Sequence, residues 1–262
     1  MSWHCGPNVV NDSLIFCFDA GNIKCTDADD AVASMRDIAP VAHSSRSDRG
    51  ITGTGNTGNF SFPTDTGASK VIDLSISTNS NSDADGDNRL ALDDDINFAD
   101  EEAWSFEWWG KLNSSAQTTA HSMAGHGAGD QWFLVDKVSG SNNWVSGFRE
   151  DDATYRLSAT QTSDVHAWHQ VVITVTTGRV MKFYIDGIAV NEYGTDGTDG
   201  GASVTITDTG TIINRIMAGY VSSSGKRYGW QGVLLCCRIY SKDLSAAEVK
   251  QNFDATRRRV GL

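Results

Sequence analysis

Proline is rare in this 262-residue sequence, with three residues, and no apolar run approaches the ~18 residues of a membrane-spanning helix. We therefore expect no membrane insertion. The N-terminus lacks the basic segment and apolar run of a secretory signal, which predicts synthesis in a cytoplasm without a signal peptide. Basic residues are also few, with 21 Lys and Arg against 33 Asp and Glu and a formal net charge of -12. Because phosphate contacts need a basic face, we expect no nucleic-acid partner.

Cysteine is scarce as well, and its pattern argues against disulfides and zinc. The five residues are odd in number, and no Cys-X-X-Cys pair occurs. Cys236 and Cys237 are adjacent and would point to opposite faces of any strand. We predict that all five are reduced structural cysteines of a protein made in a cytoplasm.

Glycine, aspartate and tryptophan, in contrast, are abundant. The chain has 26 Gly and eight Trp, and 39% of its residues are apolar, which is enough for a sizeable core. Strands joined by Gly/Asp turns suit this composition better than helical bundles, which would be richer in Ala, Leu, Glu and Lys. The length allows one large β-sandwich or two small domains, and because no linker divides the chain we expect one domain.

Alternating side chains mark the strands. The segment 14–19 is apolar at nearly every position, which predicts a strand buried on both sides. The segment 104–112 places bulky residues at every second position on one face and Glu107 and Trp109 on the other. Residues 40–88 are polar and are expected to form surface loops with short strands. Further strands are expected at 89–93, 131–136, 143–149 and 154–159.

Two local signals are specific. The pair Asp186-Gly187 stands between alternating apolar runs and predicts a two-residue hairpin turn, because both positions tolerate positive φ. Near the C-terminus, Ser245 as N-cap and Glu248 at the third helical position form a capping box, which predicts a short helix. Because this helix follows about a dozen strands, we expect an appendage of a sandwich and not a layer of it.

The same hairpin, helix and aromatic strand form a wider pattern. Segments 168–174 and 181–187 contain Trp-His-hydrophobic and Tyr-X-Asp-Gly motifs, 230–249 a closing strand and capped helix, and 104–109 an aromatic strand. This set resembles the laminin-G-like domains of the concanavalin A-like lectin/glucanase superfamily. The resemblance implies an all-β jelly-roll sandwich of two antiparallel sheets with one short C-terminal helix. The implied single domain spans 1–262, with an N-terminal strand and long loops (1–88), the best-matched core (89–256) and a tail (257–262).

Both ends of the sequence narrow this resemblance. Segments 6–8, 14–22 and 251–257 are similar to laminin-G-like proteins of tailed, especially marine, bacteriophages. That similarity implies a virion structural protein that decorates the capsid, belongs to tail fibres or attaches to glycans. Copies on a symmetric virion lattice would contact one another and other virion proteins, which predicts a homo-oligomer or a lattice of copies.

A glycan hydrolase is the enzymatic alternative on this fold. Retaining hydrolysis needs two carboxyl groups ~5–5.5 Å apart, which this fold supplies through a Glu-X-Asp-X-Glu strand. The sequence has no such pattern, because Glu107 is followed on its face by Trp109 and Lys111, and the acidic residues at 150–152 are consecutive. We therefore expect no enzymatic activity.

An acidic loop is the candidate metal site. Asp83, Asp85 and Asp87 alternate in a Gly-containing loop and could converge on calcium through oxygen ligands. The glycine stands at the fourth position, so the loop differs from an EF-hand, and a solvated acidic turn is the alternative. The aspartates at 93–95 could contribute to the site or could form a strand end and turn. His166 and His169 would face opposite ways on a strand, which favours a structural role beside the hairpin over a metal site.

Two further sets of residues are candidates for binding. Aromatic faces stack on sugar rings where they are exposed, and the candidates for glycan binding are Trp109, Trp132 and Trp144. Consecutive basic residues after the helix either complement its dipole or contact a neighbouring subunit, with the subunit contact favoured. These residues are Arg257, Arg258 and Arg259.

The leading hypothesis is a non-enzymatic phage structural protein on the virion surface that decorates the capsid and has host-surface glycans as possible ligands. A tail-fibre receptor-binding adhesin that recognises glycans is the alternative, and a glycan hydrolase is the least favoured.

Overall fold

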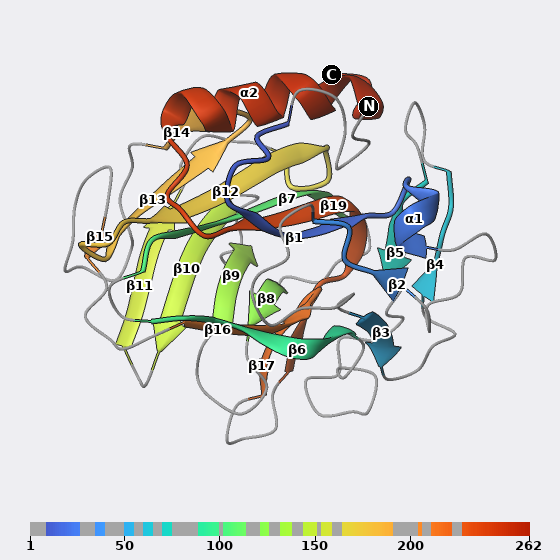
Figure 1. Cartoon of the computed structure of the whole chain (residues 1–262). Coiled ribbons are helices and arrows are strands. Elements are labelled where there is room, and N and C mark those ends of the chain that lie inside the picture. Colours follow the sequence, from blue (N-terminus) through green and yellow to red (C-terminus); the bar gives the residue numbers. More distant parts are fainter. Residues whose placement is uncertain are drawn as a thin grey trace.

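The computed structural model describes residues 9–26, 35–39, 50–54, 60–64, 70–74, 89–99, 102–113, 121–125, 132–137, 144–150, 153–158, 164–190, 204–205, 211–221 and 227–262. Two large antiparallel sheets face each other, and a C-terminal helix lies over one of them (Figure 1). The fold is the all-β jelly-roll sandwich that the sequence predicts. No helix in these ranges is long and apolar enough to span a membrane.

The first sheet has nine strands. They are β1 (Leu14–Asp19), β4 (Phe60–Ser61), β5 (Ile72–Leu74), β7 (Trp104–Leu112), β12 (His169–Val175), β13 (Val180–Ile185), β14 (Ile188–Ala189), β15 (Val204–Thr205) and β19 (Gly232–Tyr240). Their order is β14-β13-β12-β7-β19-β5-β4, with β1 also beside β19 and β15 also beside β13. The long strands β7 and β19 therefore lie at the centre of the sheet.

The second sheet has eight strands. They are β2 (Met35–Arg36), β3 (Gly50–Thr54), β6 (Arg89–Phe98), β8 (His121–Gly125), β9 (Trp132–Lys137), β10 (Trp144–Glu150), β11 (Ala153–Ser158) and β16 (Thr211–Ile216). Their order is β11-β10-β9-β8-β16-β6-β3-β2, and a separate ribbon joins β17 (Ala218–Val221) to β18 (Arg227–Gly229). The predicted strands at 131–136, 143–149 and 154–159 are confirmed to within one residue.

The two-residue period of the central strands decides which side chains fill the core. Trp104, Phe106 and Trp108 of β7 pack into the main apolar cluster between the two sheets. Trp109 belongs instead to a separate cluster on the outer face of the first sheet. Every residue of β19 is buried. The centre of the first sheet is thus covered on both faces.

The predicted hairpin is confirmed. Asp186 and Gly187 have φ angles of 53° and 78°, so both adopt the left-handed conformation that a type I′ turn requires. The turn joins β13 to β14, and β13 pairs along its length with β12. A Cβ atom on Gly187 would lie 2.9 Å from Cδ of Lys250 and 3.2 Å from Cβ of Phe253. Glycine therefore serves both the turn and the close approach of the C-terminal helix.

That helix, α2 (Ala246–Thr256), starts at the predicted capping box and continues into a short 3-10 helix, η4 (Arg257–Val260). It lies across the outer face of the first sheet (Figure 1). The ring of Phe253 stacks on Trp109 with centroids 5.5 Å apart. The expectation of an appendage is wrong, because the outer face of this sheet is apolar and α2 covers it as a partial third layer.

The expectation for residues 89–95 also needs correction. Instead of ending at residue 93, the strand continues to Phe98, and the aspartates at 93–95 lie inside it. The register between β6 and β16 shifts between Ile213 and Arg215, so these three exposed residues form a bulge. They are therefore neither a strand end nor a turn.

The cysteines differ from the prediction at one position. Cys25, Cys236 and Cys237 are free and buried, whereas Cys17 is disulfide-bonded, so the prediction of five reduced cysteines is wrong there. Cys5 lies outside the described residues. Burial raises the pKa of the Cys236 thiol to about 12, and it also raises the pKa values of Cys25 and Cys237. Because thiolates are the reactive form, the three free cysteines are structural core residues.

Candidate functional site

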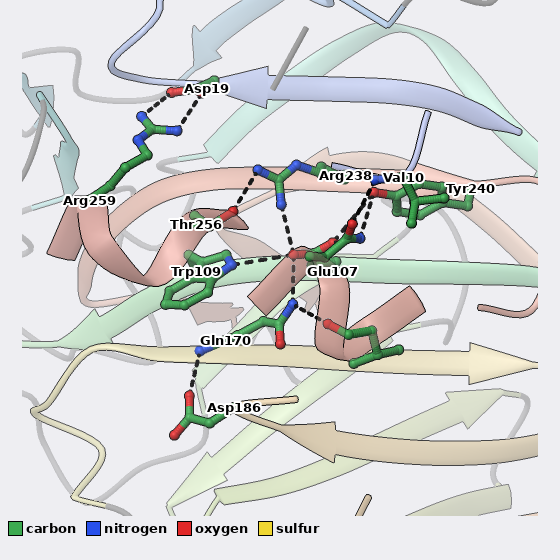
Figure 2. A network of polar contacts seen from close by, with 12 residues as sticks. Val10, Asp19, Glu107, Trp109, Gln170, Asp186, Arg238, Tyr240, Thr256 and Arg259 are labelled. Carbon is green, nitrogen blue, oxygen red and sulfur yellow. Dashed lines mark hydrogen bonds and ion pairs between the residues drawn. The ribbon is translucent and has the colours of Figure 1, made fainter. Parts of the chain in front are cut away.

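A carboxylate is buried at the centre of the first sheet, beneath α2 (Figure 2). Glu107 comes from the middle of β7, and its side chain is 0% exposed. Its Oε1 atom accepts hydrogen bonds from Nη1 of Arg238 at 2.7 Å and from Nε2 of Gln170 at 2.9 Å. The indole Nε1 of Trp109 donates to the same oxygen at 3.3 Å. Three neighbouring central strands, β7, β12 and β19, therefore converge on one oxygen atom.

The second carboxylate oxygen joins the sheet to the helix. Nδ2 of Asn252, in α2, donates to Oε2 of Glu107 at 2.7 Å and to the Tyr240 hydroxyl at 2.9 Å. The Tyr240 hydroxyl in turn lies 3.5 Å from Oε2. Oδ1 of Asn252 accepts a hydrogen bond from the backbone N–H of Val10 at 2.8 Å. One amide side chain thus connects the helix, the sheet and the N-terminal segment.

The charge of Glu107 is compensated by Arg238. Burial alone lowers the pKa of Arg238, but electrostatic interactions with neighbouring groups, Cys236 and then Glu107 first among them, outweigh burial and raise it above its usual value. Burial, followed by the charge of Glu107, raises the pKa of Tyr240 well above its usual range. Nη2 of Arg238 also donates to Oγ1 of Thr256 at 3.3 Å. The cluster is a buried ion pair surrounded by neutral hydrogen-bond partners, and two of its members belong to α2.

This geometry suits a structural anchor better than a catalytic acid. A glycosidase carboxyl group must reach both the sugar and a second carboxyl group ~5–5.5 Å away. Glu107 is 0% exposed, and both its oxygen atoms already accept hydrogen bonds from the protein. It therefore cannot contact a substrate while α2 is in place.

A second polar set fastens the hairpin turn. Nδ1 of His169 lies 2.7 Å from Oδ2 of Asp186, and Nε2 lies 3.1 Å from the carbonyl oxygen of Asp164. Oδ1 of Asp186 accepts a hydrogen bond from the backbone N–H of Gln170 at 3.0 Å. Both ring nitrogens of His169 are engaged within the protein, which fits the predicted structural role.

The tryptophan candidates have different outcomes. Trp109 is 0% exposed and lies beneath Phe253, so the prediction that it could stack on a sugar is wrong. Trp132 and Trp144 lie on the neighbouring strands β9 and β10 of the second sheet, and their side chains are outside the described part of the structure. They stay predicted sugar-stacking residues.

The calcium candidates Asp83, Asp85 and Asp87 lie outside the described residues. Within the ranges that the structure describes, no group of three or more His, Cys, Asp or Glu side chains could hold a metal ion. The exposed aspartates at 93–95 therefore do not form a metal site with other described residues.

The arginines after the helix are used mainly within the chain. Nη1 and Nη2 of Arg259 each lie 2.7 Å from a carboxylate oxygen of Asp19, in a bidentate pair. Nε of Arg257 lies 3.3 Å from Oδ1 of Asp254. Arg258 is exposed, so the predicted subunit contact stays a prediction that applies best to this residue.

One strand of the second sheet, β6, presents polar residues at the surface. Asp93, Asp94, Asp95 and Asn97 of β6 are exposed, whereas Ile96 is buried in the core. Bulges at such positions redirect side chains and are frequent beside binding sites.

The partners of Glu107 were not predicted from the sequence, although a signal was present. Arg238 is the single charged residue of the otherwise apolar strand β19, and a charge in a buried strand needs a partner. That reasoning could have paired Arg238 with Glu107. Asn252 has no comparable signal, because it is one of several polar residues of a surface helix.

Comparison with known families agrees with this architecture. The profile described as the Concanavalin A-like lectin/glucanases superfamily matches residues 83–250, more than half of the chain. The chain belongs to this superfamily. The matched residues include the three strands that hold the Glu107 cluster, which are β7, β12 and β19. The match ends inside α2. No curated protein matches its sequence.

Solved structures share the fold at low sequence identity. Domain 4 of AbnA, a GH43 extracellular arabinanase from Geobacillus stearothermophilus, was solved in complex with arabinotriose. It is 14% identical with a TM-score of 0.61, over 92% of this chain and 98% of that domain. The binding domain of Paraclostridial Mosquitocidal Protein 1 is 14% identical with a TM-score of 0.56, over 93% and 52%. The botulinum neurotoxin serotype D binding domain, in complex with N-acetylneuraminic acid, is 13% identical with a TM-score of 0.54, over 94% and 51%. The chain thus spans about half the length of these toxin binding domains.

Proposed function

We propose that this superfamily member is a non-enzymatic structural protein of a tailed-phage virion, which decorates the capsid surface and binds host-surface glycans. The observation that carries the non-enzymatic part of the proposal is the sealed first sheet, where α2 closes over Glu107. A sandwich closed in this way suits adhesion, and among the described residues it leaves the exposed polar side chains of β6 on the second sheet for a ligand.

Glycan binding is the part supported by the fold neighbours. The arabinanase domain was solved with arabinotriose, and the neurotoxin binding domain with N-acetylneuraminic acid. The likeness covers 98% of the arabinanase domain but 51% of the neurotoxin binding domain, so the arabinanase domain is the stronger support. In this chain the predicted platforms are Trp132 and Trp144, which lie at opposite ends of the β9–β10 pair, so each would act as a separate platform. Calcium held by Asp83, Asp85 and Asp87 would assist through oxygen ligands.

The virion location is supported by the resemblance of both chain ends to phage laminin-G-like proteins. Copies arranged on a capsid lattice would contact one another and their neighbours. Arg258, exposed beyond the helix, is the residue proposed for such a contact.

Glycan binding is tested on an array with the intact chain, with calcium and with a chelator. We expect selective binding that Trp144→Ala weakens by about tenfold, since loss of a stacking platform removes ~1.4 kcal/mol or more. Ile188→Ser is the matched control, because Ile188 is 70% exposed on the first sheet. An array without any bound glycan in either condition contradicts the glycan part of the proposal, and turnover of a bound glycan contradicts the non-enzymatic part.

The virion location is tested independently by immunogold labelling of purified particles. We expect label spread over the capsid. Label confined to the tail would support the adhesin alternative, and particles without the protein would contradict the structural role.

A further inference from the structure

The two chain ends hold each other on the first sheet. Nη1 and Nη2 of Arg259 clamp Asp19 at the end of β1, each at 2.7 Å, and Oδ1 of Asn252 accepts from the N–H of Val10 before it (Figure 2). Between them, the backbone N–H of Ser241 donates to the carbonyl oxygen of Ser13 at 2.8 Å. These contacts join residues 228 to 242 positions apart in the chain.

An apolar cluster accompanies the polar contacts. From the N-terminal side it contains Val9, Val10, Leu14 and Cys17, and from the C-terminal side Tyr240, Leu244 and Val249. All of these side chains are buried. The N-terminal segment therefore forms part of the surface on which α2 rests.

We infer that residues 244–260 are a strap that docks together with the N-terminal segment 9–19, so that the two ends form one cooperative unit fastened by Asn252 and Arg259. The inference is independent of the proposed function. It assigns a role to the N-terminal segment, which holds the cover over Glu107 in place through its contacts with Asn252 and Arg259.

Neither end is complete without the other. α2 has 11 residues, and isolated helices shorter than ~12–15 residues are marginal in water. If the strap left, Oε2 of Glu107 and the N–H of Val10 would both lose the Asn252 side chain. If β1 left, the Arg259 guanidinium would lose both of its bonds to Asp19. A buried group without its partner is costly, so loosening of one end favours loosening of the other.

Hydrogen–deuterium exchange of the intact chain tests this coupling through Arg259→Gln and Asp19→Asn. We expect Arg259→Gln to accelerate exchange about tenfold or more both in α2 and in β1, because the two open as one unit. Asp19→Asn, which changes the β1 side of the same contact, should also accelerate exchange both in β1 and in α2. Exchange in β12, at the centre of the first sheet, should change less than about twofold.

Lys250→Gln is the matched control. Lys250 belongs to the same helix, is exposed and pairs with Asp254 of that helix. It should change exchange in β1 less than about twofold.

The inference is overturned if Arg259→Gln accelerates exchange in α2 and η4 alone and leaves β1 protected. Should either variant unfold globally, the wild-type chain provides the same test in low concentrations of denaturant. There, amides of β1 and α2 should converge on one opening reaction before those of β12 exchange, and separate reactions for β1 and α2 would overturn the coupling.

Discussion

The two sheets differ in how the acidic residues of their described strands are placed. On the first sheet, Glu107 and Arg238 are paired beneath α2, and both side chains are 0% exposed. On the second sheet, the aspartates at 93–95 stand on an exposed bulge of β6. A carboxylate is therefore buried and paired in the first sheet, whereas carboxylates are exposed to solvent in the second.

This difference shows how burial changes the role of a carboxylate. A buried ion pair recovers its desolvation cost only if every partner is in place, so it specifies one arrangement of strands and helix. An exposed carboxylate keeps its water, imposes little on the fold and stays available to a ligand. Glu107 is thus a structural residue of the first sheet, whereas the aspartates at 93–95 are free to interact with solvent.

The largest expected effect comes from removing one partner of the buried pair. Arg238→Met should destabilise the chain by about 3–5 kcal/mol, because it leaves Glu107 charged and buried. Urea unfolding at pH 7 measures the loss. The double variant Glu107→Leu with Arg238→Met should cost less than the single change, since no charge is left uncompensated. A loss below about 1 kcal/mol for the single variant would show that the buried ion pair contributes no more to stability than an exposed charged residue does.

The next effect tests the close approach of α2 to the hairpin. Gly187→Ala adds a Cβ atom 2.9 Å from Lys250 and requires a positive φ, and should cost about 1–3 kcal/mol. Gly178→Ala is the control from the preceding turn, where the nearest atom is 3.7 Å from the new Cβ. It should alter the free energy of unfolding by about 1 kcal/mol or less. Equal effects at both glycines would show that α2 does not press on the turn.

The start of α2 provides a smaller effect. Ser245→Ala removes the N-cap acceptor of the Glu248 backbone N–H and should lower the free energy of unfolding by about 1 kcal/mol. Arg258→Gln is the control, because Arg258 is exposed, and it should leave the free energy of unfolding unchanged.

Acid should weaken the same capping box. Burial alone raises the pKa of Glu248, but hydrogen bonds from Lys242 and Ser245 outweigh it and lower the pKa below its usual value. A lowered folded-state pKa stabilises the native chain fully above the unfolded pKa of about 4.3, and this contribution is lost as pH falls through the folded value. Unfolding measured from pH 7 to pH 3 should therefore show a smaller acid loss for Glu248→Gln than for the unchanged chain. Equal acid losses would contradict the assignment.

The smallest effect is expected on the second sheet. Replacing Asp93 and Asp95 with Asn should change the free energy of unfolding by about 0.5 kcal/mol or less, because both residues are exposed. Thermal unfolding at low and high salt measures it. A larger loss would mean that the aspartates of the bulge stabilise the fold, as the Glu107–Arg238 pair does.

Much of the fold follows from local patterns, and these predictions are confirmed. The alternation in 104–112 predicts β7, Asp186-Gly187 predicts the hairpin, and Ser245 with Glu248 predicts the start of α2. Each of these signals lies within a few residues, where backbone geometry and hydrogen bonding act directly. The extension of β6 through three consecutive aspartates has no such signal, since its pairing with β3 and β16 comes from distant segments.

The candidate site was predicted less well than the fold. Trp109 has the residue type of a sugar platform, yet α2 covers it. Glu107 and Arg238 are 131 positions apart, and no local period indicates that their strands are neighbours. The disulfide at Cys17 was missed because an odd number of cysteines does not tell which of them pair.

The amino-acid sequence by itself determined the β-sandwich class, the tight turn and the capped helix, because periodicity, positive φ and capping are properties of short segments. Only the tertiary structure decided that α2 forms a third layer, that Glu107 is sealed and that β1 is clamped by Arg259. These features depend on which surfaces are left apolar or charged once the sheets have formed, and on contacts between residues more than a hundred positions apart. Burial converts such residues from surface charges into anchors, and burial is a property of the assembled fold.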